Sequence, residues 1–322
     1  AWAHLDPAFA KYQLIVLLRE WFQHPNGALP AYEWHFDDVN PPVHAAAAIR
    51  VFLIDGGADT DFLERVFQKL LLNFTWWLNR QDPDGNNIFG GGFLGLDNIS
   101  PIDRSSLPPG MRLEQADGTA WMAFYALGML MIARNLAEVR PVYEDMVVKF
   151  TEQYLMIVDA MERTGLHDHE DGWFYDRLDG PEGTTSIRVQ TLVGAIPLLP
   201  TAVLRAGDAE VARRLRHRFD RITSQAGGAE SRHVHRSADG KTVALTVVAP
   251  DELRHTLASL FDEAAFLSPH GLRSLSRRHE VPYEVPGHPG ARIEYEPGEG
   301  RTDMYGGNSN WRGPIWMPLN VM

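Results

Sequence analysis

The spacing of helix-like segments constrains the fold of this chain more than any other sequence feature. Apolar residues recur with the period of an α-helix at residues 8–22, 43–54, 60–80, 119–138, 141–162, 188–205, 208–222 and 250–261. The links between these segments alternate, being long at 23–42, 81–118 and 165–187 and short at 55–59, 139–141 and 206–208. A short link makes an antiparallel helix pair, so every second link lies at the same end of the bundle. The sequence therefore predicts stacked helical hairpins whose long links gather on one face.

This pattern is typical of an all-α toroid of paired helices such as the (α/α)6 barrel. A straight helical solenoid is the alternative, but the sequence has no fixed-period repeat of the kind that such arrays show. Residues 232–247 are the exception, because Asp239-Gly240 separates two alternating arms and predicts a small β-hairpin insertion. We expect residues 1–322 to form one domain. Both ends lie inside helix-like segments, so we expect this domain to be incomplete at each end.

Composition narrows the classes of function. The chain has 30 Lys and Arg against 42 Asp and Glu, a formal charge of -12, and such a field repels nucleic acids. The absence of Cys excludes disulfides and thiolate chemistry. No uninterrupted apolar run reaches the roughly 18 residues that a membrane-spanning helix needs, and no targeting signal precedes the first segment. We therefore expect a cytoplasmic protein without nucleic-acid or membrane partners, whose oligomeric state the sequence leaves open.

The long links combine aromatic and polar side chains in the way that saccharide binding requires. A sugar has apolar ring faces, which stack on aromatic rings, and polar edges, which need fixed carboxylate, amide or guanidinium groups. Tryptophans at helical positions, such as Trp76 and Trp77, are interpreted as core residues instead. The candidate substrate-binding residues are Glu33, Trp34, Phe93, Asn98, Gln115, Asp117, Trp311, Arg312 and Trp316.

Two segments carry a resemblance to a known family. GGFLGLDNISPIDRS, from Gly91, resembles the Gly-Leu-Asp-Asn or Gly-Leu-Asp-Asp segment of glycoside hydrolase family 63. NWRGPIWMPLN, from Asn310, is similar to that family's Trp-Arg-Gly signature, and the two segments occur in the same order. The likeness is to its bacterial glucosidase and mannosylglycerate-hydrolase-like group, relatives of processing α-glucosidase I. It implies an (α/α)6 toroid and inverting, exo-acting hydrolysis of a terminal α-glucosyl or α-mannosyl linkage in an oligosaccharide or glycosylglycerate, without a cofactor.

The resemblance also implies residue roles. The family's general acid falls on Asp97, whose carboxyl would need a raised pKa to hold its proton until the glycosidic oxygen departs. The family's general base is a Glu downstream of the Trp-Arg-Gly segment and so beyond Met322, and Glu33, Glu296 and Glu299 are the stand-ins within the chain. The alternative hypothesis is therefore a catalytically inactive saccharide-binding or scaffold fragment. A helical terpene-cyclase-like enzyme is a third reading, because Asp37-Asp38 resembles a metal-binding pair.

Several of these residues have a structural explanation as well as a functional one. Asp117 could bind a sugar hydroxyl or could cap the helix that follows it. Arg312 could bind paired oxygens of the substrate or could brace a loop through a salt bridge. Asp82 begins a sequence that imitates a calcium loop but lacks its spacing, so a turn is predicted there. His167 and His169 resemble metal ligands, yet no distant third ligand is apparent in the sequence, so no metal site is predicted.

Overall fold

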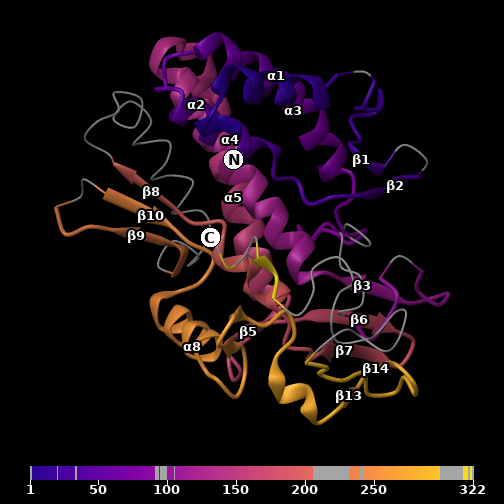
Figure 1. Cartoon of the computed structure of the whole chain (residues 1–322). Coiled ribbons are helices and arrows are strands. Elements are labelled where there is room, and N and C mark those ends of the chain that lie inside the picture. Colours follow the sequence, from indigo (N-terminus) through magenta and orange to yellow (C-terminus); the bar gives the residue numbers. More distant parts are fainter. Residues whose placement is uncertain are drawn as a thin grey trace. The chain divides into compact units, whose positions relative to one another are not determined.

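The computed structural model describes most of the chain and divides into two compact units (Figure 1). The first unit comprises Ala1–Phe89, Thr119–Ala160 and Leu199–Val247, and the second comprises Gly90–Gly118, Met161–Leu198 and Val248–Met322. The described residues are 2–19, 21–32, 35–90, 94, 100–104, 106–205, 232–239, 242–297, 315–317 and 320.

The helices of the first unit form where the apolar periodicity predicted them. They are α1 (Pro7–Leu17), α2 (His44–Ile54), α3 (Thr60–Leu78) and most of α4 (Ala116–Val139) and α5 (Glu144–Arg163), with short 3-10 turns η1 (Trp2–His4) and η2 (Pro141–Tyr143). Asp6 and Asp59 cap α1 and α3, since each carboxylate accepts a hydrogen bond from a backbone N–H three residues on. The helix predicted at 208–222 lies outside the described residues.

The core of the first unit is aromatic. Phe74 packs edge-to-face on Tyr125 and on Phe150, with ring centroids 5.1 Å apart in both pairs. The Tyr125 hydroxyl donates within this core to the Leu70 carbonyl or the Asn73 Oδ1, which lie 3.1 and 3.0 Å away. These contacts join α3, α4 and α5, so the amphipathic faces that the sequence predicted are the faces that pack.

Strands of the first unit lie in two small sheets. β1 (Pro30–Tyr32) pairs with β2 (His35–Val39), and β8 (Ala202–Arg205), β9 (Val234–Arg236) and β10 (Thr242–Leu245) form a sheet in the order β8-β10-β9. The hairpin predicted at 232–247 is therefore confirmed. The helix predicted at 188–205 is wrong, because this segment contains the 3-10 helix η3 (Leu192–Leu198) followed by β8. Pro197 and Pro200 interrupt the helical ladder there, and β8 pairs with a strand distant in the sequence.

The second unit contains more β-structure than an all-α fold allows. Its central sheet has the order β3-β6-β7, formed by β3 (Arg112–Glu114), β6 (Asp176–Gly180) and β7 (Gly183–Ile187). The expectation of a single hairpin is therefore wrong, because the long links contain paired strands. The remaining elements are η3, β4 (His167–Asp168), β5 (Trp173–Phe174), α8 (Pro250–Leu260), β11 (Leu267–Ser268), β12 (Gly271–Leu272), η4 (Arg277–Glu280), β13 (Tyr283–Glu284) and β14 (Arg292–Ile293).

Two apolar clusters support the second unit. One surrounds Trp173, whose ring stacks on Phe266 with centroids 4.9 Å apart, and includes Tyr175. The other contains Leu178, Ile187 and neighbouring apolar residues of the β3-β6-β7 sheet region. Tyr175 lies directly before β6 and Leu178 lies within it, so the chain is packed into an apolar cluster on both sides of Asp176.

Two sequence interpretations concern single elements. The Asp82 loop is a turn as predicted, since the Asp82 carboxylate accepts hydrogen bonds from the backbone N–H groups of Asn86 and Ile88.

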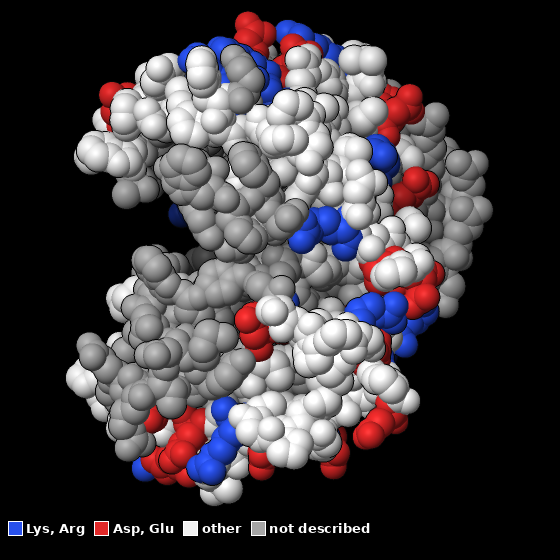
Figure 2. Space-filling view, turned by 90° about the vertical axis from the view of Figure 1, so that its right-hand side faces the viewer, with Lys and Arg blue, Asp and Glu red and all other residues white. Residues whose placement is uncertain are grey.

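Among the described helices, α4 alone has the length and apolar composition to cross a membrane, and 78% of its most apolar 18-residue stretch is buried, as in a core helix. On the face drawn in Figure 2, the described basic and acidic side chains are interspersed.

Candidate functional site

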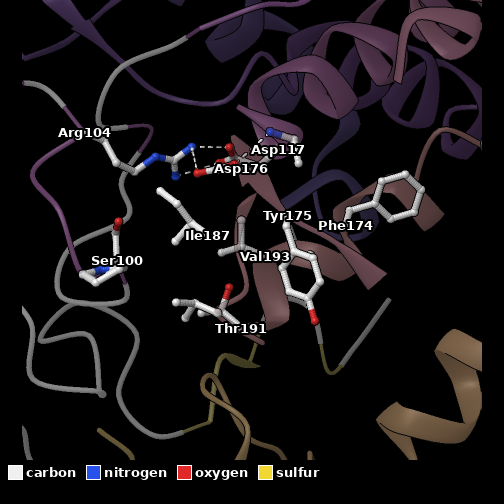
Figure 3. A pocket seen from close by; sticks show the side chains of 13 residues that line it. Ser100, Arg104, Asp117, Phe174, Tyr175, Asp176, Ile187, Thr191 and Val193 are labelled. Carbon is white, nitrogen blue, oxygen red and sulfur yellow. Dashed lines mark hydrogen bonds and ion pairs between the residues drawn. The ribbon is translucent and has the colours of Figure 1, made fainter. Parts of the chain in front are cut away.

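A small pocket of about 40 Å³ in the second unit collects polar side chains from four segments (Figure 3). The segment before β3 and the first turn of α4 supply one wall, and the β5–β6 and β7–η3 segments supply the other. Its lining residues are Ser100, Pro101, Arg104, Ala116, Asp117, Phe174, Tyr175, Asp176, Ile187, Val189, Thr191, Val193 and Gly194. An apolar wall with a few convergent polar groups is the usual composition of a small-molecule site.

Arg104 and two carboxylates form the charged centre of the pocket. Arg104 Nη1 lies 3.2 Å from Asp117 Oδ2, and its Nη2 donates to Asp117 Oδ1, so the pair is bidentate. The same Nη2 lies 3.5 Å from Asp176 Oδ2. The side chains of Arg104 and Asp117 are 4% and 0% exposed, whereas that of Asp176 is 20% exposed. Asp176 is therefore the carboxylate of this group that a ligand can reach.

The pocket changes the proton affinity of Asp176. Burial raises its pKa to about 6 from the ordinary value of 3.8, and the nearby Asp117 carboxylate acts in the same direction. Arg104 and the backbone N–H of Ala116, which donates to Asp176 Oδ1 over 2.8 Å, oppose this shift. The effect of burial on this pKa exceeds the attraction of Arg104. Asp176 can thus change protonation state near neutral pH.

The opposite wall is held by hydrogen bonds and close packing. The Tyr175 hydroxyl donates to Asp171 Oδ2 over 2.7 Å, and Gln190 Nε2 lies 3.3 Å from it. Burial raises the pKa of Tyr175, so this phenol stays neutral. A Cβ at Gly194 would lie 2.1 Å from Trp173 Nε1, so the wall requires glycine at this position.

The structure tests only part of the predicted site. Asp117 lines the pocket, Gln115 is buried nearby without being one of the lining residues, and Trp316 is half-buried against the cluster that contains Tyr175. Glu296 is buried and is also not a lining residue. Asp97, the predicted general acid, and the candidates Glu33, Trp34, Phe93, Asn98, Trp311 and Arg312 lie outside the described residues, as does Glu299.

Sequence reasoning missed Arg104, Asp176 and Tyr175. Arg104 stood inside the quoted GGFLGLDNISPIDRS segment, and Asp176 follows the aromatic run Trp173-Phe174-Tyr175, so an acidic residue directly after an aromatic strand was the available signal. The interpretation of Asp117 as a helix cap is wrong. It is the second residue of α4, and its carboxylate is engaged by Arg104.

The pocket brings charged and apolar side chains together, and comparison with known proteins identifies the class of the chain. Residues 1–229 match the family of the mannosylglycerate hydrolase MGH1-like glycoside hydrolase domain, so the chain belongs to that family of glycoside hydrolase domains. All residues that line the pocket fall within the matched range. The resemblance to glycoside hydrolase family 63 is confirmed.

The chain is also similar to individual proteins. The chain is 44% identical to "Uncharacterized protein YMR196W" of Saccharomyces cerevisiae over 99% of its own length, and it spans 32% of that protein. Two structures from Thermus thermophilus share the fold. Each match covers 99% of this chain and 74% of the other chain. One, an uncharacterized conserved protein, has a TM-score of 0.60 at 17% identity. The other, a GH63 mannosylglycerate hydrolase in complex with glucose, has a TM-score of 0.57 at 15% identity.

Proposed function

We propose that the chain contributes the catalytic pocket of an inverting, exo-acting glycoside hydrolase that cleaves a terminal α-glucosyl or α-mannosyl linkage. The observation that carries the proposal is the Arg104–Asp117–Asp176 group in a chain that belongs to a glycoside hydrolase family. The substrates we propose are a glycosylglycerate or an oligosaccharide with such a terminal residue. We further infer that the helices belong to an (α/α)6 toroid, for which the fold shared with the GH63 mannosylglycerate hydrolase is the support.

The proposed roles follow from charge and reach. Asp97 is the general acid, and it stands three residues before Ser100 of the pocket in the sequence. Asp176 presents a carboxyl that can donate or accept a hydrogen bond to a sugar hydroxyl, because its pKa lies near neutral pH. Arg104 and Asp117 position this carboxyl through their shared ion pair. Phe174 and Val193 supply apolar surface.

Inversion needs a second carboxylate across the sugar, about 6.5 to 9.5 Å from the acid, to activate a water molecule. We propose that this base is either a Glu downstream of Met322 or, within the chain, Asp176, which is ionised above its pKa. The second candidate function is a saccharide-binding or scaffold role without catalysis.

The test measures release of glucose or mannose from glucosylglycerate, mannosylglycerate and a terminal α-glucosyl oligosaccharide, together with binding of each by calorimetry. We expect Asp97→Asn to lower kcat about 100- to 10,000-fold, the usual loss when a general acid is removed, and to retain binding. Asp176→Asn should weaken binding, and should also abolish turnover if Asp176 is the base. Asp179→Asn, on the same strand but outside the pocket, is the matched control.

Each outcome separates the hypotheses. Turnover that Asp97→Asn abolishes supports the hydrolase, and detection of the product anomer by NMR then tests inversion. Binding without turnover by the unaltered chain supports the saccharide-binding role. Turnover that Asp97→Asn leaves unchanged, or binding that Asp176→Asn and Asp179→Asn reduce equally, contradicts the roles proposed for these residues.

A further inference from the structure

A second group of chemically active side chains lies in the second unit, outside the residues that line the pocket. It consists of Glu162, His167, His169 and Glu252. The expectation that no distant ligand approaches the two histidines is wrong. Glu162 comes from the last turn of α5 and Glu252 from the first turn of α8, and both carboxylates meet the imidazoles of the β4–β5 hairpin.

The distances within this group suit a single small cation. One ligand atom from each residue can be chosen so that all four lie within 4.8 Å of one another. His167 Nδ1 and His169 Nδ1 lie 3.6 and 3.4 Å from Glu252 Oε1. His169 Nε2, the other nitrogen of that ring, lies 3.2 Å from Glu162 Oε1, and only one of the two nitrogens of His169 can bind the ion. Tetrahedral zinc with bonds of about 2.0–2.2 Å places its ligand atoms about 3.4 Å apart. The widest separation, 4.8 Å, therefore needs to shorten by about 1.4 Å to hold the ion.

The donor set selects the metal. Two imidazole nitrogens and two carboxylate oxygens match the borderline ligand preference of Zn²⁺, whereas Ca²⁺ and Mg²⁺ prefer sites made of oxygen atoms. We propose that Glu162, His167, His169 and Glu252 bind a structural Zn²⁺. Four protein ligands close the coordination sphere, which distinguishes a structural zinc from a catalytic one that keeps an open position.

Neighbouring hydrogen bonds hold the ligands in place. The Asp168 carboxylate, between the two histidines, accepts hydrogen bonds from the N–H groups of Glu170 and Asp171 over 3.0 and 2.9 Å and so fixes the turn. Glu252 Oε2 accepts from the N–H of Ala249 over 2.8 Å, which leaves Oε1 directed toward the histidines. Such supporting contacts orient ligands and raise the affinity of metal sites.

α8 and the hairpin are also joined directly. Thr256 Oγ1 donates to the Gly172 carbonyl over 2.8 Å, and a Cβ at Gly172 would lie only 2.6 Å from the His255 ring. Glycine at position 172, with φ of +62°, therefore allows the close approach that brings Glu252 to the histidines. These two contacts hold α8 against the hairpin that carries the histidines.

Burial is graded across the site. The side chains of His167 and Glu252 are 2% and 10% exposed, whereas that of His169 is 56% exposed. The ion thus has a path from solvent through His169, and His167 packs against Phe174 on its other side, with ring centroids 4.6 Å apart. Since His167 pairs with Phe174 across β4 and β5, and Tyr175 and Asp176 follow in the chain, the zinc would fix the strand that enters the pocket.

The test is equilibrium dialysis of the 322-residue chain against Zn²⁺ with metal quantification, repeated with Co²⁺ as a spectroscopic probe of tetrahedral geometry. We expect one metal ion per chain and a tetrahedral Co²⁺ spectrum. His169→Ala removes the most exposed ligand, so this variant should fold, and we expect its affinity to fall by at least about 10- to 100-fold. Glu162→Gln should weaken binding as well. His270→Ala, an exposed histidine of the same unit, is the matched control and should bind like the unaltered chain.

The proposal is overturned if the unaltered chain binds less than one Zn²⁺, or if His169→Ala and His270→Ala bind Zn²⁺ equally. The four side chains would then form only hydrogen bonds and ion pairs. Because the measurement uses no sugar, its result is independent of the proposed hydrolase activity. Glu252 lies outside the range matched by the glycoside hydrolase family, whereas the other three ligands lie inside it.

Discussion

Replacing Asp176 by Asn should stabilise the folded protein at neutral and alkaline pH, although it removes a charge from beside Arg104. The amide has the same shape as the carboxyl, and its oxygen can keep the hydrogen bond from the Ala116 N–H. The pocket holds the carboxyl in an environment that favours the neutral form, because burial outweighs the attraction of Arg104. A neutral isostere therefore avoids the cost of ionisation in the folded state.

The magnitude follows from the pKa of Asp176. The folded-state pKa is raised to about 6 from 3.8, and each unit corresponds to about 1.4 kcal/mol, so ionisation costs about 3 kcal/mol of stability well above pH 6. The direction of the pH dependence follows from proton binding. Below pH 3.8 the Asp176 carboxyl is protonated in both the folded and the unfolded state, so the cost of ionisation is absent. Stability is therefore lost as the pH rises from about 3.8 to about 6, and it does not change further well above pH 6. Between pH 4 and 7.5 the advantage of Asp176→Asn over the unaltered chain should grow by about 2 to 3 kcal/mol.

Urea unfolding of both proteins at intervals from pH 4 to pH 8, followed by circular dichroism, measures this difference. Taking the difference at each pH removes the contribution of the other titrating groups. Asp179→Asn is the matched control, because Asp179 lies on the same strand and its carboxylate faces Arg112 at 3.2 Å. It should show no growing advantage. If Asp176→Asn is less stable than the unaltered chain at pH 7.5, or if the difference does not change with pH, the reasoning about Asp176 is wrong.

Two further predictions concern packing in the first unit. Gly128→Ala places a Cβ 2.8 Å from the Ala45 Cβ where α4 crosses α2, so we expect a loss of about 1 to 3 kcal/mol in the free energy of unfolding; an unchanged unfolding midpoint would contradict this close approach. Tyr125→Phe removes a buried hydroxyl that lies near the Leu70 carbonyl and Asn73 Oδ1, and we expect a loss of about 1 to 2 kcal/mol by urea unfolding. A neutral or stabilising result would mean that these acceptors find other donors.

The local sequence pattern was sufficient to predict helices and hairpins whose hydrogen bonds and caps come from residues nearby in the chain. α3 was predicted at 60–80 and spans Thr60–Leu78, because its apolar face and the Asp59 cap are both encoded in that segment. The hairpin at 232–247 was predicted for the same reason, from a turn between alternating arms. The segment 188–205 failed, because an apolar run with two prolines is compatible with several conformations. Pairing of β8 with β10 then selected the strand.

The sequence by itself determined the main helices of the first unit, the acidic balance and the family. Only the tertiary structure decided which charges meet. Arg104, Asp117 and Asp176 are brought together by α4 and β6, and Glu252 reaches His167 across 85 residues of chain. The spacing of apolar residues indicates whether a segment forms a helix or a strand and which of its faces packs. The pKa of a carboxyl and the ligand set of an ion depend instead on distances and burial between segments remote in the chain.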